Sequence, residues 1–297
     1  MTVGVLVMAY GTPRDRDDIA TYYTDIRRGR PPTPELLADL VRRYDALGGT
    51  FPLREITDRQ VAAIADVLGA DFTVTLGTKH SVPKVEDGVR SLAAAGVDRI
   101  VGLVLAPHYS RFSIGEYAER AAKAAAEVGL DADTVSSWHL QPAYLAFVED
   151  SVRAALAAVP TGSHVVFTAH SLPERILATG DPYPEQLRET AERAAGALGL
   201  TSWSVGWQSA GRTPEPWLGP DVLDVVRRCA ADGAPGLVVC ACGFVADHLE
   251  VAYDLDIEAA ALAAELGLPF ARTASVNDDP TVMRALAEIV AAHSSGR

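Results

Sequence analysis

The chain has 297 residues, 48% of them apolar, and a formal net charge of −13 at pH 7. This length predicts one large or two medium domains, and the apolar share is sufficient for folded cores. The negative charge argues against nucleic-acid binding, which depends on clustered cations that neutralise phosphates. Composition therefore favours a globular enzyme that handles a small molecule or a cation.

The cysteines and the N-terminal residues indicate the cellular compartment. Three cysteines are too few for a secreted disulfide framework in a chain of this length. The sequence MTVGVLVMAYGTP lacks the basic region with which a signal peptide begins. The longest clean apolar run, residues 100–107, has the length of a strand and not of a membrane span. We therefore expect a cytoplasmic protein that is not an integral membrane protein.

Short apolar runs alternate along the chain with amphipathic, alanine-rich stretches. Strands are predicted at residues 3–8, 71–76, 100–106, 134–137, 164–169, 202–207, 236–241 and 269–272. Helices are predicted between them, among others at residues 34–47, 57–68, 85–95, 114–128 and 183–198. Strands and helices that alternate at this pitch indicate an α/β protein with parallel sheets and helices on both faces.

The order of these elements repeats once. VGVLVMAYGTP near the start resembles SHVVFTAHSLP, and VEDGVRSLAAAGVDRIVGLVLAPHYS resembles DVLDVVRRCAADGAPGLVVCACGFVADH. We predict two similar Rossmann-like, doubly wound domains, residues 1–149 and 150–297, each with a parallel four-stranded sheet. The last helix, at about residues 279–294, can pack back on the N-terminal half.

Side chains capable of chemistry follow the strands. Tyr10 and His170 come after the first strand of each half, and the runs HYS and DHLE, residues 108–110 and 247–250, come after the third. In open α/β sheets, the ligand crevice lies beyond the carboxyl ends of the strands. A cleft between the halves therefore brings Tyr10, His170 and Glu250 towards one another, around a ligand large enough to span both.

The segment GFVADHLEVAYDLDIE, residues 243–258, carries a row of carboxylates. Glu250, Asp254 and Glu258 follow one another at i, i+4 spacing, and the segment contains no Lys or Arg. This spacing puts the three side chains on one stripe of a helix. Two interpretations are open for the segment alone: a solvated acidic face or a path for divalent cations.

Seven motifs in this chain resemble those of the ferrochelatases. AYGTP, YYTDIRRGRPP, LAPHYSRFS, TAHSLPERI, GDPYPEQL, VGWQSAGRTPEPWLGPDV and GFVADHLEVAYDLDIE occur in the order and spacing of that family. The resemblance runs from about residue 3 to the C-terminus and is greatest to the soluble coproporphyrin ferrochelatases of Gram-positive bacteria. It implies insertion of Fe(II) into coproporphyrin III, which gives coproheme in heme biosynthesis, and a fold of two Rossmann-like domains.

The resemblance implies that His170 and Glu250 are catalytic and contact the metal. Metallation removes two pyrrole N–H protons and passes a desolvated cation into the ring, so it requires a base and a cation route. His170 of TAHSLP matches the histidine that accepts a proton or contacts metal, and a histidine side chain, whose unperturbed pKa lies near neutrality, suits either role. Glu250 matches the acidic partner across the cleft. A polar loop histidine is the alternative interpretation of His170.

The resemblance extends to the rest of the acidic stripe and to Tyr10. Asp254 and Glu258 match a second, more exposed metal site on a helix with a π-type bulge, where magnesium or another divalent ion can bind. A solvated stripe remains the alternative for Glu258. Tyr10 matches a tyrosine that can ligate the product iron. Its alternative is an aromatic side chain that packs at a strand end.

A porphyrin with several propionates requires cations in this acidic chain. Arg27 and Arg28, in DIRRGRPP, can bind carboxylates in a bidentate manner. A solvated basic loop is the alternative. Hydroxyl groups that could donate to a propionate are expected at Ser110, Ser113 and Tyr117.

Three further residues are expected near the porphyrin. His80 in GTKH matches a family position near the mouth of the cleft, although a structural role fits this histidine equally well. Thr50 and Phe51 lie in GGTFPL, where the family usually has GGxSPL. Phe51 replaces a serine, so a hydroxyl contact is lost and an aromatic surface is gained.

A second departure concerns cofactors. Cys240 and Cys242 form a CxC in which the two side chains share one face of a strand. Many actinobacterial relatives bind a [2Fe–2S] cluster through four cysteines, partly in a C-terminal extension. This sequence has three cysteines and no such extension. We therefore expect no cluster and no other prosthetic group, with buried, small apolar roles for Cys240 and Cys242.

Other functions remain open at this point. A protoporphyrin IX ferrochelatase, a sirohydrochlorin-type chelatase for cobalt or nickel, and a tetrapyrrole carrier without turnover are the alternatives. The expected partners are the porphyrin, Fe(II) and, transiently, the enzymes before and after this one in heme biosynthesis. The resembled enzymes generally act as monomers.

Overall fold

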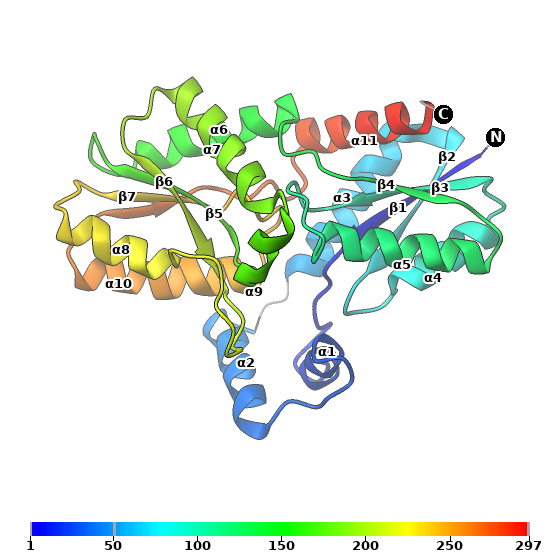
Figure 1. Cartoon of the computed structure of the whole chain (residues 1–297), viewed down its shortest axis with the longest axis horizontal. Coiled ribbons are helices and arrows are strands. Elements are labelled where there is room, and N and C mark those ends of the chain that lie inside the picture. Colours follow the sequence, from blue (N-terminus) through cyan, green and yellow to red (C-terminus); the bar gives the residue numbers. More distant parts are fainter. Residues whose placement is uncertain (1, 50–51, 296–297) are drawn as a thin grey trace.

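The structure of the chain is a computed structural model that describes residues 2–49 and 52–295. In this part of the chain, eight strands form two four-stranded parallel sheets that lie side by side, with helices on their faces (Figure 1). The strand order is β2-β1-β3-β4 in the first sheet and β6-β5-β7-β8 in the second. The two halves therefore have the same topology, which confirms the predicted α/β fold of two similar Rossmann-like units.

The first sheet is built from residues of the N-terminal half. Its strands are β1 (Val3–Ala9), β2 (Phe72–Thr78), β3 (Arg99–Val104) and β4 (Ala132–Val135). All residues of β1 are buried, because the strand pairs with β2 on one side and β3 on the other and is covered on both faces. A central strand covered in this way has the near-continuous run of valine and leucine seen here.

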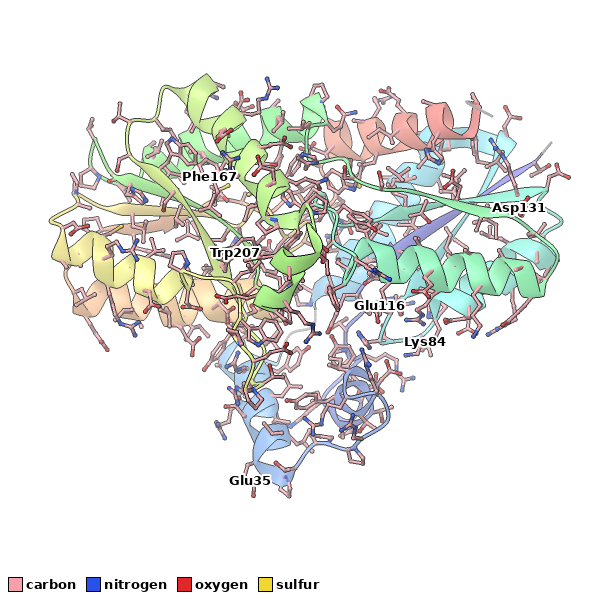
Figure 2. The ribbon with its side chains drawn as sticks, viewed as in Figure 1. Glu35, Lys84, Glu116, Asp131, Phe167 and Trp207 are labelled. Atoms are coloured by element: carbon pink, nitrogen blue, oxygen red, sulfur yellow. The ribbon has the colours of Figure 1, made fainter. Side chains whose placement is uncertain are left out.

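The second sheet repeats this arrangement. Its strands are β5 (His164–His170), β6 (Trp203–Gln208), β7 (Leu237–Cys240) and β8 (Phe270–Arg272). The central strand β5 pairs with β6 and β7, and its interior residues are buried. Figure 2 shows Phe167 and Trp207 among the densely packed side chains of this half.

Helices connect and cover the strands. They are α1 (Ile19–Ile26), α2 (Pro34–Ala46), α3 (Pro52–Leu68), α4 (Val85–Ala94), α5 (Ile114–Glu127), α6 (Pro142–Leu156), α7 (Tyr183–Leu198), α8 (Val222–Ala231), α9 (Leu249–Val251), α10 (Ala260–Glu265) and α11 (Pro280–Ser295). Two short 3₁₀ segments, Gly69–Asp71 and Glu174–Thr179, and a π-helix, Ala252–Ala259, complete the described elements. The π-helix lies directly between α9 and α10, within the predicted acidic stripe.

Local signals explain where several helices begin. Proline occupies the first turn of α2 and α6, where its missing N–H costs no hydrogen bond. Asp221 precedes α8, and its side chain accepts a hydrogen bond from the Leu223 N–H at 2.8 Å. α3 begins at Pro52, five residues before its predicted start, because proline suits a first helical turn. β4 also begins two residues earlier than predicted, since its pairing with β3 starts at Ala132.

One buried hydrophobic cluster spans both halves, and each half has a smaller cluster of its own. A single buried cluster contains Val101 of the first sheet, Phe167 of the second and Met283 of α11. α11 packs against α3 and α6, and Figure 1 shows it lying over the N-terminal half. α6 runs through residues 149 and 150, so one continuous helix occupies the point where the sequence places the domain boundary.

The two cysteines of the CxC are part of this core. Cys240 and Cys242 are 2% and 5% exposed, and both belong to the cluster that joins the halves. Burial raises the pKa of the Cys242 thiol, so this side chain is neutral and behaves as a small apolar residue. Across residues 2–49 and 52–295, no helix has the length and apolar character needed to cross a membrane.

Candidate active site

A large cleft lies between the two halves. Its volume is about 710 Å³, and its walls come from the ends of β1, β3 and β5, from α1 and α2, and from the π-helix segment. Tyr10, Ser113, Tyr117, His170, Glu250, Asp254 and Glu258 all line it. The structure thus brings together seven of the residues that the sequence singles out.

His170 is the last residue of β5, and hydrogen bonding determines the state of its imidazole. The Nδ1–H group donates to the carbonyl oxygen of Ser171 at 2.5 Å. A carbonyl oxygen can only accept, so Nδ1 carries a proton and Nε2 presents its lone pair in the neutral ring. Nε2 lies 3.7 Å from a carboxylate oxygen of Glu250. The more basic nitrogen of His170 therefore faces both the cleft and a carboxylate.

A second histidine approaches the same carboxylate oxygen of Glu250. His248 donates from Nδ1 to the carbonyl oxygen of Ala246 at 2.9 Å, and its Nε2 lies 3.6 Å from the carboxylate of Glu250. Burial alone would lower the pKa of His248, but the hydrogen bond and charge of Glu250 outweigh it and raise that pKa. Two imidazoles thus present Nε2 to one oxygen of Glu250.

Glu250 stays ionised over the physiological range. Burial acts to raise the pKa of its carboxyl group, but the charges of His170, His248 and Arg43, with the hydrogen bond from His248, lower that pKa to about 2. Its side chain is 37% exposed, so its carboxylate remains open to the cleft. A permanent negative charge at this position can attract a cation and stabilise an imidazolium beside it.

Asp254 lies deeper than Glu250, on the π-helix. Its carboxylate accepts a hydrogen bond from the Ser209 hydroxyl at 2.5 Å, and Arg43 Nη1 lies 3.8 Å away. Burial and the charges of Glu250 and Glu258 raise the pKa of Asp254 to about 6, against the opposing effects of Ser209 and Arg43. The carboxylates of the stripe therefore differ in charge state, since Glu250 ionises far more readily than Asp254.

The acidic stripe does not form a closed metal cage. Within the described ranges, no group of three or more His, Cys, Asp or Glu side chains is close enough to hold an ion. Glu250, Asp254 and Glu258 are instead spread along the wall of the cleft. Each of the three supplies carboxylate oxygen atoms, the donors that hard divalent cations prefer.

Tyr10 and His80 meet where the cleft adjoins a second, smaller cavity. Tyr10 is 44% exposed, and its ring packs edge-on against His80 with the centroids 4.7 Å apart. His80 Nδ1 lies 2.8 Å from a carboxylate oxygen of Asp25. Burial and the neighbouring Lys79 and Lys84 lower the pKa of His80 to about 4, although Asp25 acts to raise it, so the ring is neutral near pH 7.

The predicted substrate residues are not all placed alike. Arg28 follows α1 and lines the smaller cavity, whereas Arg27 caps α1 and lines neither cavity. Ser110 is fully buried, and its hydroxyl donates to Asp181 at 2.9 Å, so it is removed from the walls of both cavities. Thr50 and Phe51 lie outside the described residues.

The family is decided by comparison with known proteins. A family model described as ferrochelatase matches residues 2–294. The chain belongs to the ferrochelatase family. The coproporphyrin III ferrochelatase of Geobacillus kaustophilus (strain HTA426) is 46% identical over 300 residues, covering 97% of this chain and 95% of the relative. That of Halalkalibacterium halodurans is 44% identical over 297 residues, covering 97% and 96%.

Solved structures of distant chelatases share the ferrochelatase fold seen here. SirB from Bacillus subtilis with Fe³⁺ aligns with a TM-score of 0.65 at 11% identity, covering 100% of this chain and 98% of that one. CbiX, described as the terminal enzyme for biosynthesis of siroheme in denitrifying bacteria, aligns at 0.57 and 15% identity, with 97% and 98% covered. At such identities the likeness concerns architecture alone.

Two residues of this ferrochelatase site are not singled out by sequence, and a third, His248, is marked only as part of the run at residues 247–250, without a role of its own. Arg43 of α2 approaches Asp254 and stacks on Tyr253 at 4.6 Å, but nothing in the pattern of α2 marks it. Lys79 lines both cavities, and only its place after β2 hints at this.

Proposed function

We propose that the chain inserts Fe(II) into coproporphyrin III and so forms coproheme in heme biosynthesis. The observation that carries this is the pairing of His170 Nε2 with Glu250 at 3.7 Å in a cleft of about 710 Å³. The two coproporphyrin III ferrochelatases described above match nearly the whole chain, which supports the same porphyrin as substrate. Fe(II) is a substrate of this reaction and not a resident cofactor.

In this proposal His170 is the base. Its Nε2 lone pair faces the cleft, because Nδ1 is committed to the Ser171 carbonyl, and it accepts the pyrrole protons one at a time. Glu250 stabilises the resulting imidazolium, since its pKa of about 2 keeps it negatively charged. His248 approaches the same carboxylate oxygen of Glu250, and its raised pKa favours a cation that holds this carboxylate in place.

Glu258, Asp254 and Glu250 form the proposed route for the incoming cation. Each contributes carboxylate oxygen atoms, which suit a hydrated divalent ion. Asp254, with a pKa of about 6, gains a proton more easily than Glu250 and so binds a cation less tightly at mildly acidic pH. We place Asp254 and Glu258 at an outer station that binds Fe(II) in passage and can also hold magnesium.

The porphyrin contacts are proposed at the opposite wall of the cleft. Tyr10 faces the ring and can ligate the product iron through its oxygen. Arg28, Ser113 and Tyr117 line the two cavities and are retained as carboxylate or ring contacts. His80 is proposed to act through Tyr10, on which it packs.

We also propose a cellular compartment, an oligomeric state, partners and domain bounds for the chain. We propose that the chain acts in the cytoplasm as a monomer, with transient contacts to the enzymes that supply its porphyrin and receive its product. Its domains are proposed as residues 1–149 and 150–297, with α6 as the helix that joins them.

An anaerobic assay tests the proposal directly. Fe(II) uptake is followed by absorbance with coproporphyrin III and, separately, with protoporphyrin IX. Faster turnover per bound porphyrin with coproporphyrin III is expected. Preference for protoporphyrin IX would reassign the substrate, and tight porphyrin binding without metallation of either would indicate a carrier.

A further inference from the structure

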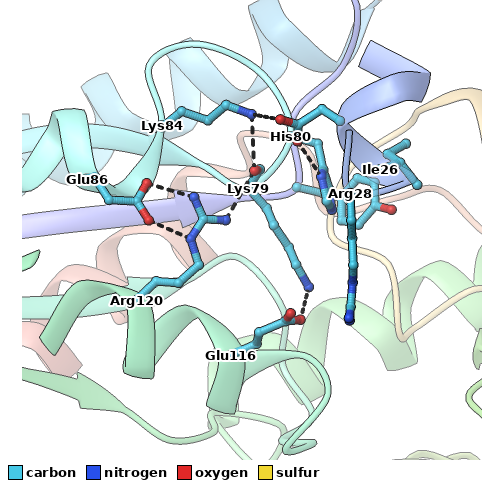
Figure 3. A pocket seen from close by; sticks show the side chains of 10 residues that line it. Ile26, Arg28, Lys79, His80, Lys84, Glu86, Glu116 and Arg120 are labelled. Carbon is cyan, nitrogen blue, oxygen red and sulfur yellow. Dashed lines mark hydrogen bonds and ion pairs between the residues drawn. The ribbon is translucent and has the colours of Figure 1, made fainter. Parts of the chain in front are cut away.

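A second cavity lies next to the cleft on the N-terminal half. Its volume is about 540 Å³, and most of the side chains that line it are charged and come from α1, α4, α5 and the loops beside them (Figure 3). We call it the side chamber. Tyr10, Ile26 and Lys79 line both the side chamber and the cleft, so these three residues form the shared wall. A substituent on a ligand in the cleft can therefore reach the chamber past this wall.

The cations of the side chamber are almost all paired. Arg120 makes a bidentate ion pair with Glu86 at 2.7 and 2.8 Å, and Lys84 pairs with Asp25 at 2.7 Å. These two pairs hold α5 to α4 and α1 to the loop after β2. Among residues 2–49 and 52–295, Arg28 takes part in no ion pair.

Lys79 differs from the other cations because of its partner. Its ammonium pairs with Glu116 and lies 5.5 Å from the centre of the Tyr117 ring. The Lys79 side chain is 13% exposed, whereas that of Glu116 is 40% exposed. A largely buried cation is thus neutralised by a carboxylate that remains in contact with solvent. This is the arrangement in which one carboxylate can be exchanged for another.

The backbone of Lys79 is fixed, so only its side chain needs to move. The Lys79 N–H donates to Ala9 at 2.9 Å and the His80 N–H to Tyr10 at 3.0 Å, which ties this loop to the end of β1. The Lys79 carbonyl oxygen accepts from Arg120 at 3.1 Å. Glu116 lies in the first turn of α5, where the positive end of the helix stabilises a carboxylate even without a lysine partner.

We propose that the side chamber binds one carboxylate of the substrate through Lys79, and that Glu116 occupies this position until the substrate displaces it. This inference rests on the proposed function, since it assigns a subsite to a porphyrin carboxylate. Coproporphyrin III carries one propionate on each of its four pyrrole rings, so whichever pyrrole ring lies nearest the shared wall brings a propionate with it. A porphyrin with two propionates on one edge can turn both of them away from it.

The proposal makes Glu116 a residue that weakens binding and Lys79 one that strengthens it. Glu116→Gln frees Lys79, so the Kd for metal-free coproporphyrin III should fall about two- to fivefold, the range expected for breaking a partly exposed ion pair. The Kd for deuteroporphyrin IX, which has two propionates, should change less. Lys79→Met should raise the Kd for coproporphyrin III about tenfold, because a charge-assisted contact is lost. In the Lys79→Met background, Glu116→Gln should have no effect.

Porphyrin fluorescence titration measures these constants, with Glu119→Gln as the matched control. Glu119 is an exposed residue of the same helix, and its substitution removes the same charge. Equal changes for Glu116→Gln and Glu119→Gln would overturn the proposal, because the effect would then be long-range charge only. An unchanged Kd for Lys79→Met, or for Lys79→Gln if the first variant does not fold, would also overturn it.

Measuring both the porphyrin Kd and the turnover separates failure of the carboxylate subsite from failure of the proposed enzyme function. If the parent chain binds coproporphyrin III but does not metallate it, the enzyme proposal fails while the carboxylate subsite stands on its Kd values. If the parent turns over normally and the two glutamine variants bind alike, only the subsite is refuted.

Discussion

The two halves have the same strand order but opposite chemistry at the ends of their strands. In the N-terminal half, β1 and β2 lead into Tyr10, Lys79 and His80, which face the cleft or the side chamber. In the C-terminal half, β5 ends in His170, and the segment after β7 supplies Glu250 and the π-helix. A duplicated scaffold thus supplies a phenol and cations on one side and a base and carboxylates on the other.

This difference shows that strand order decides where a site lies and loop residues decide what it does. The cationic side suits the carboxylates of a porphyrin, and the acidic side suits a divalent metal. Substitutions on either side should therefore separate porphyrin binding from metal delivery.

The largest expected effect is on the acidic side, at His170. His170→Ala should bind porphyrin with an unchanged Kd but lose at least roughly a hundredfold in turnover, because the base is removed. Anaerobic turnover and porphyrin titration measure the two quantities. His164→Ala is the control, since His164 lies at the other end of β5 between Ser202 and Ser204. Turnover within a factor of two of the parent for His170→Ala would remove His170 from the mechanism.

The next effect concerns repulsion among the carboxylates. The pKa of Asp254 is raised from 3.8 to about 6 by burial and by Glu250 and Glu258, so the folded state binds its proton more tightly than the unfolded state. The resulting stabilisation is complete below pH 4 and is lost as the pH rises through 6. Asp254→Asn should therefore gain about 1 to 3 kcal/mol over the parent between pH 4 and pH 7.

Thermal unfolding of the parent and Asp254→Asn at a series of pH values tests this. The difference in Tm should increase steadily from pH 4 to pH 7. A constant difference would show that Asp254 has an ordinary pKa and that the carboxylates of the stripe do not repel one another strongly.

A smaller effect is expected at Glu258, the outer end of the proposed metal route. Glu258→Gln should raise the KM for Fe(II) several-fold and leave kcat and the porphyrin Kd nearly unchanged, since one of several oxygen donors is lost. Glu265→Gln, on α10 in the same continuous helical segment, is the control. Loss of porphyrin binding in Glu258→Gln would contradict a role in metal delivery.

The smallest effect is expected where the two halves touch at the surface. Arg59 of α3 pairs with Asp278 at 2.8 Å, and both side chains are at least one-third exposed. Asp278→Asn should lower the free energy of unfolding by at most about 1 kcal/mol, as for most exposed pairs. Chemical denaturation should still show one transition, because the halves share a buried core. Two separate transitions would show that the surface pair, and not the core, joins them.

Much of the fold follows from local pattern. Runs such as VGVLVMA and HVVFTAH are almost wholly buried as β1 and β5, because continuous apolar runs of that length fit central parallel strands. All eight predicted strands have counterparts in the described residues, with boundaries shifted by a few positions. α1 is less evident from sequence, since its eight residues mix tyrosines and threonines with few apolar repeats.

Less of the site than of the fold follows from the sequence. Motif resemblance singles out His170 and Glu250, but it gives no distance between them, and the run at residues 247–250 includes His248 without assigning it a role. Ser110 has the expected residue type in the expected motif, yet its hydroxyl is committed to Asp181. Whether a polar side chain faces the ligand or a neighbouring loop depends on contacts between residues far apart in the sequence.

By itself, the sequence determined the α/β class, the duplication, the family and the three carboxylates of the stripe, because periodicity and motif spacing are local properties. Only the tertiary structure decided that these carboxylates differ, with Glu250 approached by two imidazoles and Asp254 buried beside Ser209. It also decided that Lys79 meets Glu116 on the shared wall of two cavities. The reason is that charge state and partner choice depend on burial and on neighbours from other elements.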